Sequence, residues 1–217
     1  MGELDFSMMR AAMVSNQLRT NNVGDPRIIA AMEIVARERF VPVDRAALAY
    51  VDVPIPLGNG RALNAPLATA RLITESGVKP GEKILLVGSA TGYAAALLAQ
   101  LGAIVTALEV DDALIATAKA VLGKTVGITL VSGPLNAGWR KGAPYEVIIV
   151  DGAIDMVPDA FAAQLAPGGR ILTGLVDKGV TRLAAGRKAG QGVGLVSFAD
   201  IEAVRLPGFA APEGFSF

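Results

Sequence analysis

The chain lacks both cysteine and histidine. Without cysteine it has no disulfide, no thiolate nucleophile and no thiolate metal site. Without histidine it has neither the commonest general base nor a Ser-His-Asp triad. A net charge is absent as well, because 20 basic residues balance 20 acidic ones, and no basic surplus points to nucleic acid. The acids are scattered, so we expect no metal site.

Long apolar runs are also missing. No stretch reaches about 18 uninterrupted apolar residues, so no membrane span is predicted. The first residues contain acids and no basic patch before an apolar core, which is not the pattern of a secretory signal. The chain is nevertheless 52% hydrophobic, with a mean hydropathy of +0.47, which is enough for a large core. These features, in 217 residues, favour one domain of a cytoplasmic protein.

The chain does contain a β-α-β pattern between Lys83 and Glu109. An apolar run is followed by a turn of small residues, an Ala/Leu-rich helix and a second apolar run that ends in Glu109. The small residues allow the backbone to pass close to a ligand, and the helix N-terminus offers free N–H groups. Glu109 lies 21 residues after Gly88, where a carboxylate can accept hydrogen bonds from both hydroxyls of a ribose. The pattern indicates an adenosine-type cofactor.

The rest of the chain alternates helix and strand patterns. Asp25-Pro26 predicts a helix start, and residues 51–66, with three prolines and two glycines, predict an irregular loop. The later alternation predicts a mostly parallel sheet covered on both faces, with the loops after its first, second and fourth strands at one ligand-binding edge. We expect strands near 83–88, 104–108, 127–132, 146–150, 170–175, 192–198 and 201–207, and helices near 7–20, 26–39, 44–49, 67–77, 92–101, 111–122, 156–165 and 180–187.

Several segments together resemble one family. They are MVSNQLRTNNVGDPRIIAAMEIVARERFVP (13–42), AYVDVPIPLGNGRALNAP (49–66), VGSATGY (87–93), LEV (108–110), APYEVIIVDGA (143–153) and LAPGGRIL (165–172). In this combination the chain resembles the protein-L-isoaspartate O-methyltransferases, which are class I S-adenosylmethionine-dependent enzymes. The resemblance implies an α/β, Rossmann-like, doubly wound and mostly parallel sheet, with antiparallel C-terminal edge strands and a small helical N-terminal region.

The resemblance also implies a domain layout, an activity and a site. The layout is a single methyltransferase-like domain over 1–217, with a helical region at 1–50, a substrate loop at 51–66 and a Rossmann-like core at 80–217. The implied activity is methyl transfer from S-adenosylmethionine to the α-carboxyl group of L-isoaspartyl residues in damaged proteins or peptides. That reaction needs alignment and desolvation more than acid-base chemistry, so a chain without histidine or cysteine can run it. The implied partners are isoaspartyl peptides or proteins, without nucleic acid or membrane.

Each implied site residue matches a position of the family motifs. Asn64 is the catalytic position, and Ile55, Leu57, Leu63 and Pro66 are the substrate contacts. The implied cofactor contacts are Gly88, Ser89, Ala90, Thr91, Gly92, Glu109, Val110, Gly133, Pro134, Leu135 and Asp151.

The chain departs from the family pattern at four positions. Asn64 stands where the family has a serine, Leu86 where it has an acid, Ala90 where it has a glycine and Pro134 where an acid helps to hold the adenine. A Cβ at position 90 is strained if the backbone there needs a positive φ. Two alternatives therefore stay open. One is a binding or regulatory module whose cofactor pocket has changed, and the other is methyl transfer to a different carboxylate acceptor.

Single residues also have plainer interpretations. Glu109 can be a solvated strand end, and Asn64 can simply shape a loop, because asparagine favours turns. Asp151 can cap the helix that follows its strand. Trp139, the only tryptophan, is expected to pack over the edge of the sheet.

Overall fold

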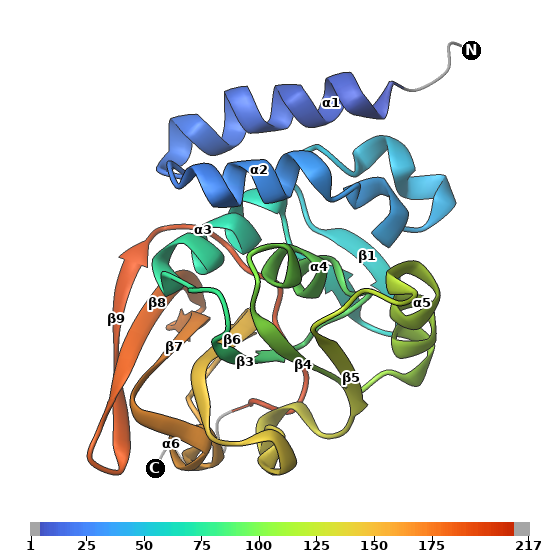
Figure 1. Cartoon of the computed structure of the whole chain (residues 1–217). Helices are drawn as coiled ribbons and strands as arrows, with labels where there is room; N and C mark the ends of the chain where they lie inside the picture. The colour runs from blue at the N-terminus through green and yellow to red at the C-terminus, as the bar shows by residue number, and fades with distance from the viewer. Residues whose placement is uncertain (1–4, 211–217) are drawn as a thin grey trace.

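The computed structural model describes residues 5–210, and a seven-stranded mixed sheet forms its centre (Figure 1). The strand order is β5-β4-β3-β6-β7-β8-β9; the strands from β5 to β7 are parallel, and β8 and β9 are antiparallel at one edge. A separate two-stranded hairpin consists of β1 and β2. The predicted fold class is confirmed. The strands are β1 Ile55–Gly58, β2 Arg61–Leu63, β3 Lys83–Val87, β4 Ile104–Glu109, β5 Ile128–Ser132, β6 Tyr145–Ile154, β7 Leu165–Asp177, β8 Val180–Ala189 and β9 Gly192–Ala199.

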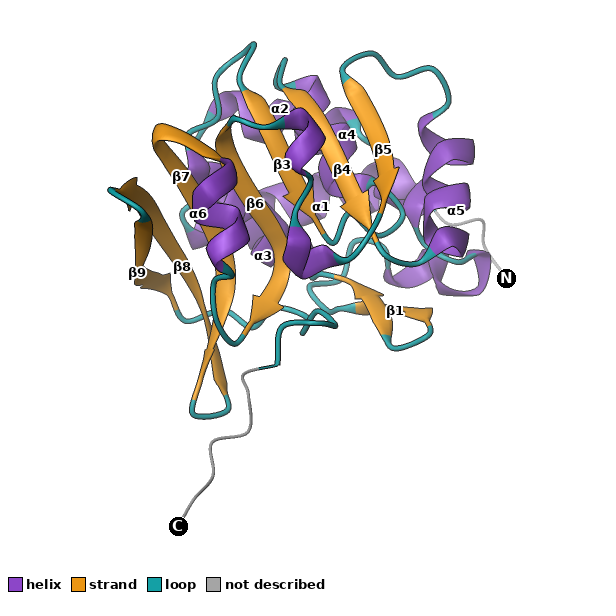
Figure 2. Cartoon of the chain, turned by 90° about the horizontal axis from the view of Figure 1, so that it is seen from below, coloured by secondary structure: helices purple, strands orange, loops and turns teal. Residues whose placement is uncertain are grey.

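Helices cover both faces of the sheet, because the central strands are apolar on both sides. In β3, Ile84 and Leu86 belong to one core with α3, α4 and α5, whereas Leu85 and Val87 belong to a second core with α6. Figure 2 shows α6 in front of the sheet and α1 to α4 behind it. Within residues 5–210, no helix is long and apolar enough to cross a membrane. The helices are α1 Phe6–Met13, α2 Pro26–Ile34, α3 Pro66–Ser76, α4 Tyr93–Gln100, α5 Asp112–Leu122 and α6 Asp159–Gln164, with π or 3-10 turns at Val14–Leu18, Arg19–Asn21, Arg37–Phe40, Val43–Leu48, Leu135–Ala137 and Arg140–Gly142.

The predicted start of α2 is confirmed. Asp25 accepts a hydrogen bond from the backbone N of Arg27 (2.9 Å), and Pro26 is the first helical residue. The end of this helix was predicted too late, near residue 39. The backbone of Val35 is extended, with ψ at 110°, so α2 ends at Ile34 and a separate 3-10 turn follows.

Two predictions for the C-terminal part were wrong. Residues 180–187, expected as a helix, lie in β8. Lys178 and Gly179 have φ values of 48° and 83° and form a two-residue hairpin turn, which returns the chain alongside β7. Residues 201–207, expected as a strand, form only one isolated bridge, between Ala153 and Arg205. We call residues 201–207 the strap, because they run alongside the end of β6.

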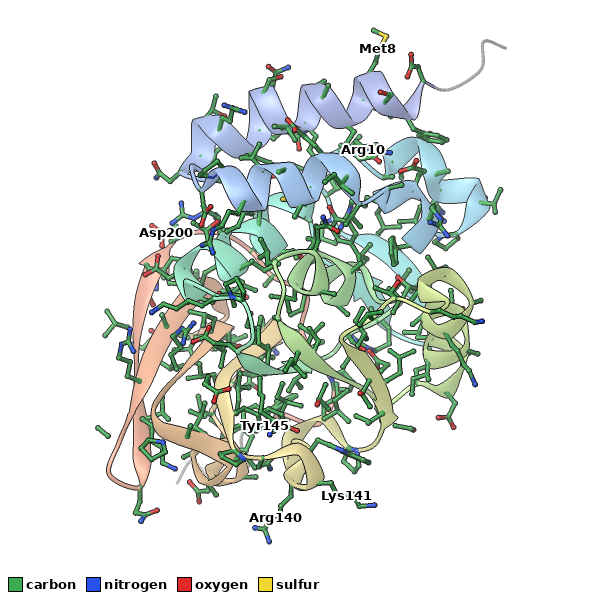
Figure 3. All side chains as sticks on the ribbon, viewed as in Figure 1. Met8, Arg10, Arg140, Lys141, Tyr145 and Asp200 are labelled. Carbon is green, nitrogen blue, oxygen red and sulfur yellow. The ribbon has the colours of Figure 1, made fainter. Side chains whose placement is uncertain are left out.

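Polar contacts hold the helical N-terminal region together, and an aromatic contact attaches it to α4. Arg10, labelled in Figure 3, donates from Nε to the hydroxyl of Tyr50 (2.7 Å) and pairs through Nη2 with Glu38 (3.1 Å). The ring of Phe40 meets that of Tyr93, at the start of α4, edge-on at 5.6 Å between centroids. The region is thereby fixed next to the helix that begins after the β3 turn.

The two-sided burial of β3 predicts where the fold is sensitive. Ile84→Ala, at a position with no exposed surface, is expected to lower the free energy of unfolding by about 2–5 kcal/mol. Ile104→Ala, on the adjacent strand but 53% exposed, is the matched control and should change it by at most about 0.5 kcal/mol. Urea unfolding of both variants checks this, and equal losses would contradict the assignment of the cores.

Candidate active site

A tight turn follows β3 at the carboxyl edge of the sheet. Gly88 and Gly92 have φ values of 76° and 95°, which glycine adopts without strain. Ala90 has a φ of 49°, a left-handed conformation that costs a residue with a Cβ about 1–2 kcal/mol. The backbone N atoms of Gly88 and Ser89 both donate to the carbonyl of Leu108, at 2.9 and 3.1 Å. The turn is therefore tied to the end of β4.

Glu109, the last residue of β4, is fully buried. Its Oε2 accepts from the backbone N of Ala90 (2.8 Å), and its Oε1 accepts from the backbone N atoms of Val110 (2.9 Å) and Asp111 (3.3 Å). A buried charge needs such partners, because its desolvation is costly. Glu109 is thus no solvated strand end, and the structure joins it to the turn.

Arg61 approaches the same carboxylate from β2, and the sequence analysis did not single it out. Its Nη2 lies 2.7 Å from Oε2 of Glu109, and its Nε lies 3.2 Å from Oε1. The arginine side chain is 3% exposed, so this is a buried ion pair. Arg61 is the only basic residue between positions 51 and 66, and this is the one feature of the sequence that could have marked it as a site residue. Nothing local shows that it reaches a residue 48 positions away.

Asn64 and Asp151 meet in the same region. Oδ1 of Asp151 accepts from Nδ2 of Asn64 (2.8 Å) and from the hydroxyl of Thr69 (3.0 Å). Burial raises the pKa of Asp151, because these hydrogen bonds and the positive charges of Arg37 and Arg61 offset the desolvation only in part. Asp151 lies within β6 and does not cap α6, whose N-cap residue is Pro158.

The strap closes over Asn64. The backbone N of Val204 donates to Oδ1 of Asn64 (2.7 Å), and the backbone N of Ala153 donates to the carbonyl of Val204 (2.7 Å). Both ends of the Asn64 amide are therefore used inside the protein. Asn64 is 1% exposed and links Asp151 to the strap.

Leu206 of the strap packs against two glycines of the sheet edge. A Cβ built on Gly88 would come within 2.7 Å of Cδ1 of Leu206, and one built on Gly152 within 2.5 Å of its Cγ. Only glycine permits this approach at either position. The strap therefore covers the turn after β3 from the side of β6.

Arg37 fixes the backbone beneath Asn64. Its Nε donates to the carbonyl of Ala49 (2.8 Å), and its Nη2 donates to the carbonyl of Asn64. Its guanidinium lies over the ring of Tyr93, with 4.6 Å to the centroid. Burial lowers the pKa of Arg37. The sequence analysis did not single out this residue either, because all its partners are distant along the chain.

The four expected substrate contacts are buried or half-buried. Ile55 and Leu63 are buried in the core, and Pro66 is the buried first residue of α3, so these side chains support the hairpin and the helix. Leu57 is half-buried against the same core. These four residues do not form a continuous exposed groove.

The loop after β5 contributes mainly backbone. The N atom of Gly133 donates to the carbonyl of Glu109 (3.1 Å), and the side chain of Leu135 is buried in the second core. Pro134 and Val110 are exposed. Trp139 packs against the second core, as expected.

The turn also contains two hydroxyl groups. The hydroxyl of Thr91 donates to the carbonyl of Phe40 (2.6 Å), so Thr91 ties the turn to the N-terminal region. Ser89 Oγ is buried and has no hydrogen-bond partner among the described residues.

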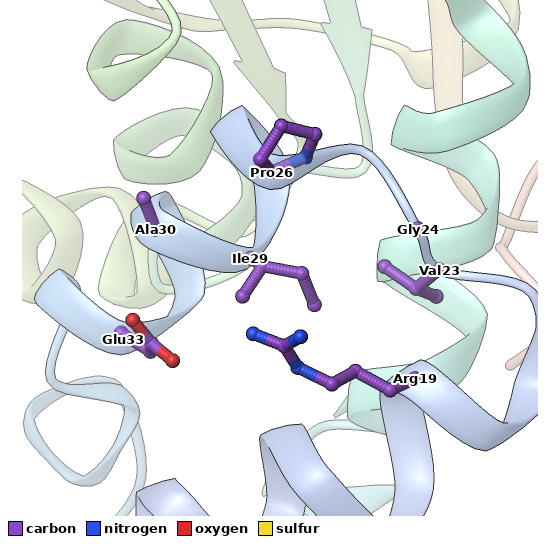
Figure 4. A pocket seen from close by; sticks show the side chains of 7 residues that line it. All are labelled: Arg19, Val23, Gly24, Pro26, Ile29, Ala30 and Glu33. Carbon is purple, nitrogen blue, oxygen red and sulfur yellow. The ribbon is translucent and has the colours of Figure 1, made fainter.

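A separate cavity of about 380 Å³ lies in the N-terminal region and includes none of the expected site residues. Figure 4 shows Arg19 and Glu33 projecting into it from two different segments. Among residues 5–210, no cluster of His, Cys, Asp and Glu that could hold a metal is present. The lining residues are Arg19, Val23, Gly24, Pro26, Ile29, Ala30 and Glu33.

Comparison with known proteins identifies the family. The sequence profile of protein-L-isoaspartate(D-aspartate) O-methyltransferase (PCMT) matches residues 8–205. The chain belongs to this family. A protein-L-isoaspartate O-methyltransferase of Methylorubrum populi (strain ATCC BAA-705 / NCIMB 13946 / BJ001) is 42% identical over 164 residues, which cover 75% of this chain and 77% of that protein. The family expected from the sequence motifs is therefore confirmed.

Solved structures of the PCMT family share the fold. One protein-L-isoaspartate O-methyltransferase matches with a TM-score of 0.79 at 21% identity, over 92% of this chain and 66% of that one. A PCMT from Plasmodium falciparum, in complex with S-adenosyl-L-homocysteine, matches with a TM-score of 0.74 at 17% identity, over 94% of this chain and 99% of that one. In this chain, Arg61 forms a buried ion pair with Glu109 at the carboxyl edge of that fold.

The buried ion pair predicts a large effect of Glu109→Gln on stability. The variant leaves the guanidinium of Arg61 without a charged partner, so the free energy of unfolding should fall by about 3–5 kcal/mol. Asp200→Asn removes the acid of the exposed pair Arg182–Asp200 and should change it by at most about 1 kcal/mol. Denaturant unfolding at neutral pH measures both, and a loss for Glu109→Gln no larger than for the control would contradict the prediction.

The raised pKa of Asp151 predicts a pH-dependent stability. In the folded protein the charged form of Asp151 is disfavoured, so the stability that its neutral form provides is lost as pH rises from the ordinary carboxyl range through the raised pKa. Asp151→Asn keeps an acceptor for Asn64 and Thr69 but does not titrate.

Unfolding of both proteins between about pH 4 and pH 8 tests this prediction. The wild type should lose stability relative to Asp151→Asn as the pH rises. A difference that stays constant, or one that changes in the opposite direction, would show that the pKa of Asp151 is not raised.

Proposed function

We propose that this chain transfers a methyl group from S-adenosylmethionine to the carboxylate of L-isoaspartyl residues in proteins or peptides. The observation that carries the proposal is the buried Glu109 carboxylate beside the glycine turn, in a chain that belongs to the PCMT family. Its two oxygens are arranged to accept two parallel hydrogen bonds, which suits the adjacent hydroxyls of a ribose. The related structure from Plasmodium falciparum contains S-adenosyl-L-homocysteine, the demethylated product.

The residues fit an adenosyl ligand provided that the side chains of Arg61 and Leu206 move away from the turn and from Glu109. Gly88 and Gly92 permit a close backbone approach and Glu109 provides the acceptor pair, but Arg61 and Leu206 lie against these groups. When bound, the cofactor supplies an activated methyl group on sulfur. Glu109 would bind the ribose hydroxyls, and the turn would hold the rest of the nucleoside close to the sheet edge.

The acceptor carboxylate needs orientation and a dry environment. It is already a nucleophile at neutral pH, so no side chain has to remove a proton from it. In this proposal Asn64, held by Asp151, by the guanidinium of Arg37 and by the backbone of the strap, orients the carboxylate, and the covering strap helps to exclude water. The acceptor would be a peptide or protein partner in the cytoplasm.

Methyl transfer to a synthetic isoaspartyl peptide tests the proposal directly. With radiolabelled S-adenosylmethionine, the isoaspartyl peptide should gain label, and the same peptide with a normal aspartyl residue should not. Equal labelling of both peptides would point to another carboxylate acceptor. No labelling of either one, with cofactor binding retained, would refute the proposed substrate.

Asn64→Ala separates turnover from cofactor binding. Loss of the orienting amide should lower kcat by at least about tenfold, or about 1.4 kcal/mol in the barrier, while the Kd for S-adenosyl-L-homocysteine changes by less than about threefold. The exposed Asn16→Ala is the matched control and should leave both quantities unchanged. Unchanged turnover in Asn64→Ala would remove Asn64 from the mechanism.

A further inference from the structure

The contact between Arg61 and Glu109 has the form of a ligand contact. The guanidinium gives two roughly parallel N–H donors to the two oxygens of Glu109, at 2.7 and 3.2 Å. A ribose would give two O–H donors to the same two atoms. Arg61 therefore presents to the carboxylate the donor pattern that the proposed cofactor would present, and this inference rests on the proposed function.

The acceptor capacity of Glu109 is already used. A carboxylate has about four lone-pair sites on its two oxygens. Backbone N–H groups of Ala90, Val110 and Asp111 take three contacts, and Arg61 adds two more. Two hydroxyl donors can be accommodated only if the contacts made by Arg61 are broken, since the backbone donors are fixed by the fold.

The hairpin that carries Arg61 is the part of the site best able to move. Within residues 5–210 its strands, Ile55–Gly58 and Arg61–Leu63, pair only with each other, and an isolated two-stranded hairpin is marginally stable. The register is irregular between Pro56 and Gly58, and the tip at 58–60 is exposed. Figure 2 shows the hairpin outside the main sheet, near the ends of its parallel strands.

A polar contact holds the hairpin tip. Nδ2 of Asn59 donates to Oδ2 of Asp111 (3.0 Å), next to the start of α5. At the base of the hairpin, Ile55 and Leu63 remain anchored in the core. The tip and Arg61 can therefore withdraw together while the base keeps its place.

We propose that Arg61 is an internal competitor for Glu109, so that an adenosyl ligand binds only when the β1–β2 hairpin withdraws Arg61 from this carboxylate. The observed affinity then equals the intrinsic affinity multiplied by the fraction of molecules in which Arg61 is withdrawn. Arg61 sets cofactor affinity without contacting the reacting atoms. The closed form protects the buried carboxylate until the ligand replaces the guanidinium.

Calorimetric titration with S-adenosyl-L-homocysteine tests this proposal in Arg61→Gln. Glutamine is shorter and uncharged, and Glu109 keeps its three backbone donors. The Kd should fall by at least about tenfold relative to the wild type. Arg182→Gln, which removes an exposed arginine from an ion pair, is the matched control and should leave the Kd unchanged. A Kd that is unchanged or higher in Arg61→Gln overturns the proposal.

Asn59→Gly provides an independent variant in case Arg61→Gln does not fold. Asn59 has a φ of 50°, which glycine adopts without strain, and the substitution removes only the contact with Asp111. Loosening the tip should lower the Kd by about two- to tenfold. A Kd equal to or above that of the wild type in this variant also counts against the proposal.

The outcomes separate this inference from the proposed function. Binding by the wild type together with weaker binding by Arg61→Gln would mean that Arg61 holds the ligand, which overturns the inference and leaves the methyltransferase proposal intact. Binding by Arg61→Gln but not by the wild type, up to about 1 mM ligand, would support the competitor role and limit the activity of the natural chain. If the wild type, Arg61→Gln and Asn59→Gly all fail to bind S-adenosyl-L-homocysteine, both proposals are overturned.

Discussion

The need to compensate a buried carboxylate connects the parts of this site. Glu109 is fully buried, and its charge is compatible with that position only because donors reach it from three directions. They come from the turn after β3, from the backbone at the start of α5 and from Arg61 on the hairpin. The parallel pairing of Val87 with Leu108 sets this arrangement, because it places Glu109 next to the turn. The Glu109 carboxylate therefore depends on three features: the sheet register, the positive φ at Ala90 and the docking of the hairpin.

Within residues 5–210, the second buried carboxylate, that of Asp151, has no ion pair like that of Glu109 among its hydrogen bonds. Asp151 has two hydrogen bonds, both at Oδ1, and its pKa is raised, so the protein favours the neutral form more than it does for an ordinary aspartate. Its partner Asn64 also accepts from the backbone of Val204. Glu109 pairs with the charged guanidinium of Arg61, whereas Asp151 and Asn64 accept from uncharged amide, hydroxyl and backbone donors. The same asparagine thereby serves a structural purpose, because it joins Asp151 to the strap.

Local chemistry made much of the fold predictable. The apolar runs of β3 and β4, the small-residue turn and the Asp25-Pro26 start of α2 are all encoded within a few residues. Residues 180–187 misled the prediction, because their alanine, leucine and arginine content suits a helix, whereas a two-residue turn and pairing on both sides make them a strand. The contacts of Arg61 and Val204 join residues 48 and 140 positions apart, and no local pattern contains such distances.

The groups left without partners limit how this site can recognise a ligand. The amide of Asn64, the hydroxyl of Thr91 and both oxygens of Glu109 are all engaged within the protein. Among the described residues, four buried polar atoms of the site have no hydrogen bond: Nη1 of Arg37, Nη1 of Arg61, Oγ of Ser89 and the hydroxyl of Tyr93. A buried donor without a partner raises the free energy of the closed form. The unpaired Nη1 of Arg61 therefore offsets part of the stabilisation that its ion pair with Glu109 provides. When a ligand replaces Arg61, the Arg61–Glu109 ion pair is lost, but the buried, unpaired Nη1 of Arg61 is released as well. The second effect partly offsets the first, so the difference in free energy between the closed and the ligand-bound forms becomes smaller.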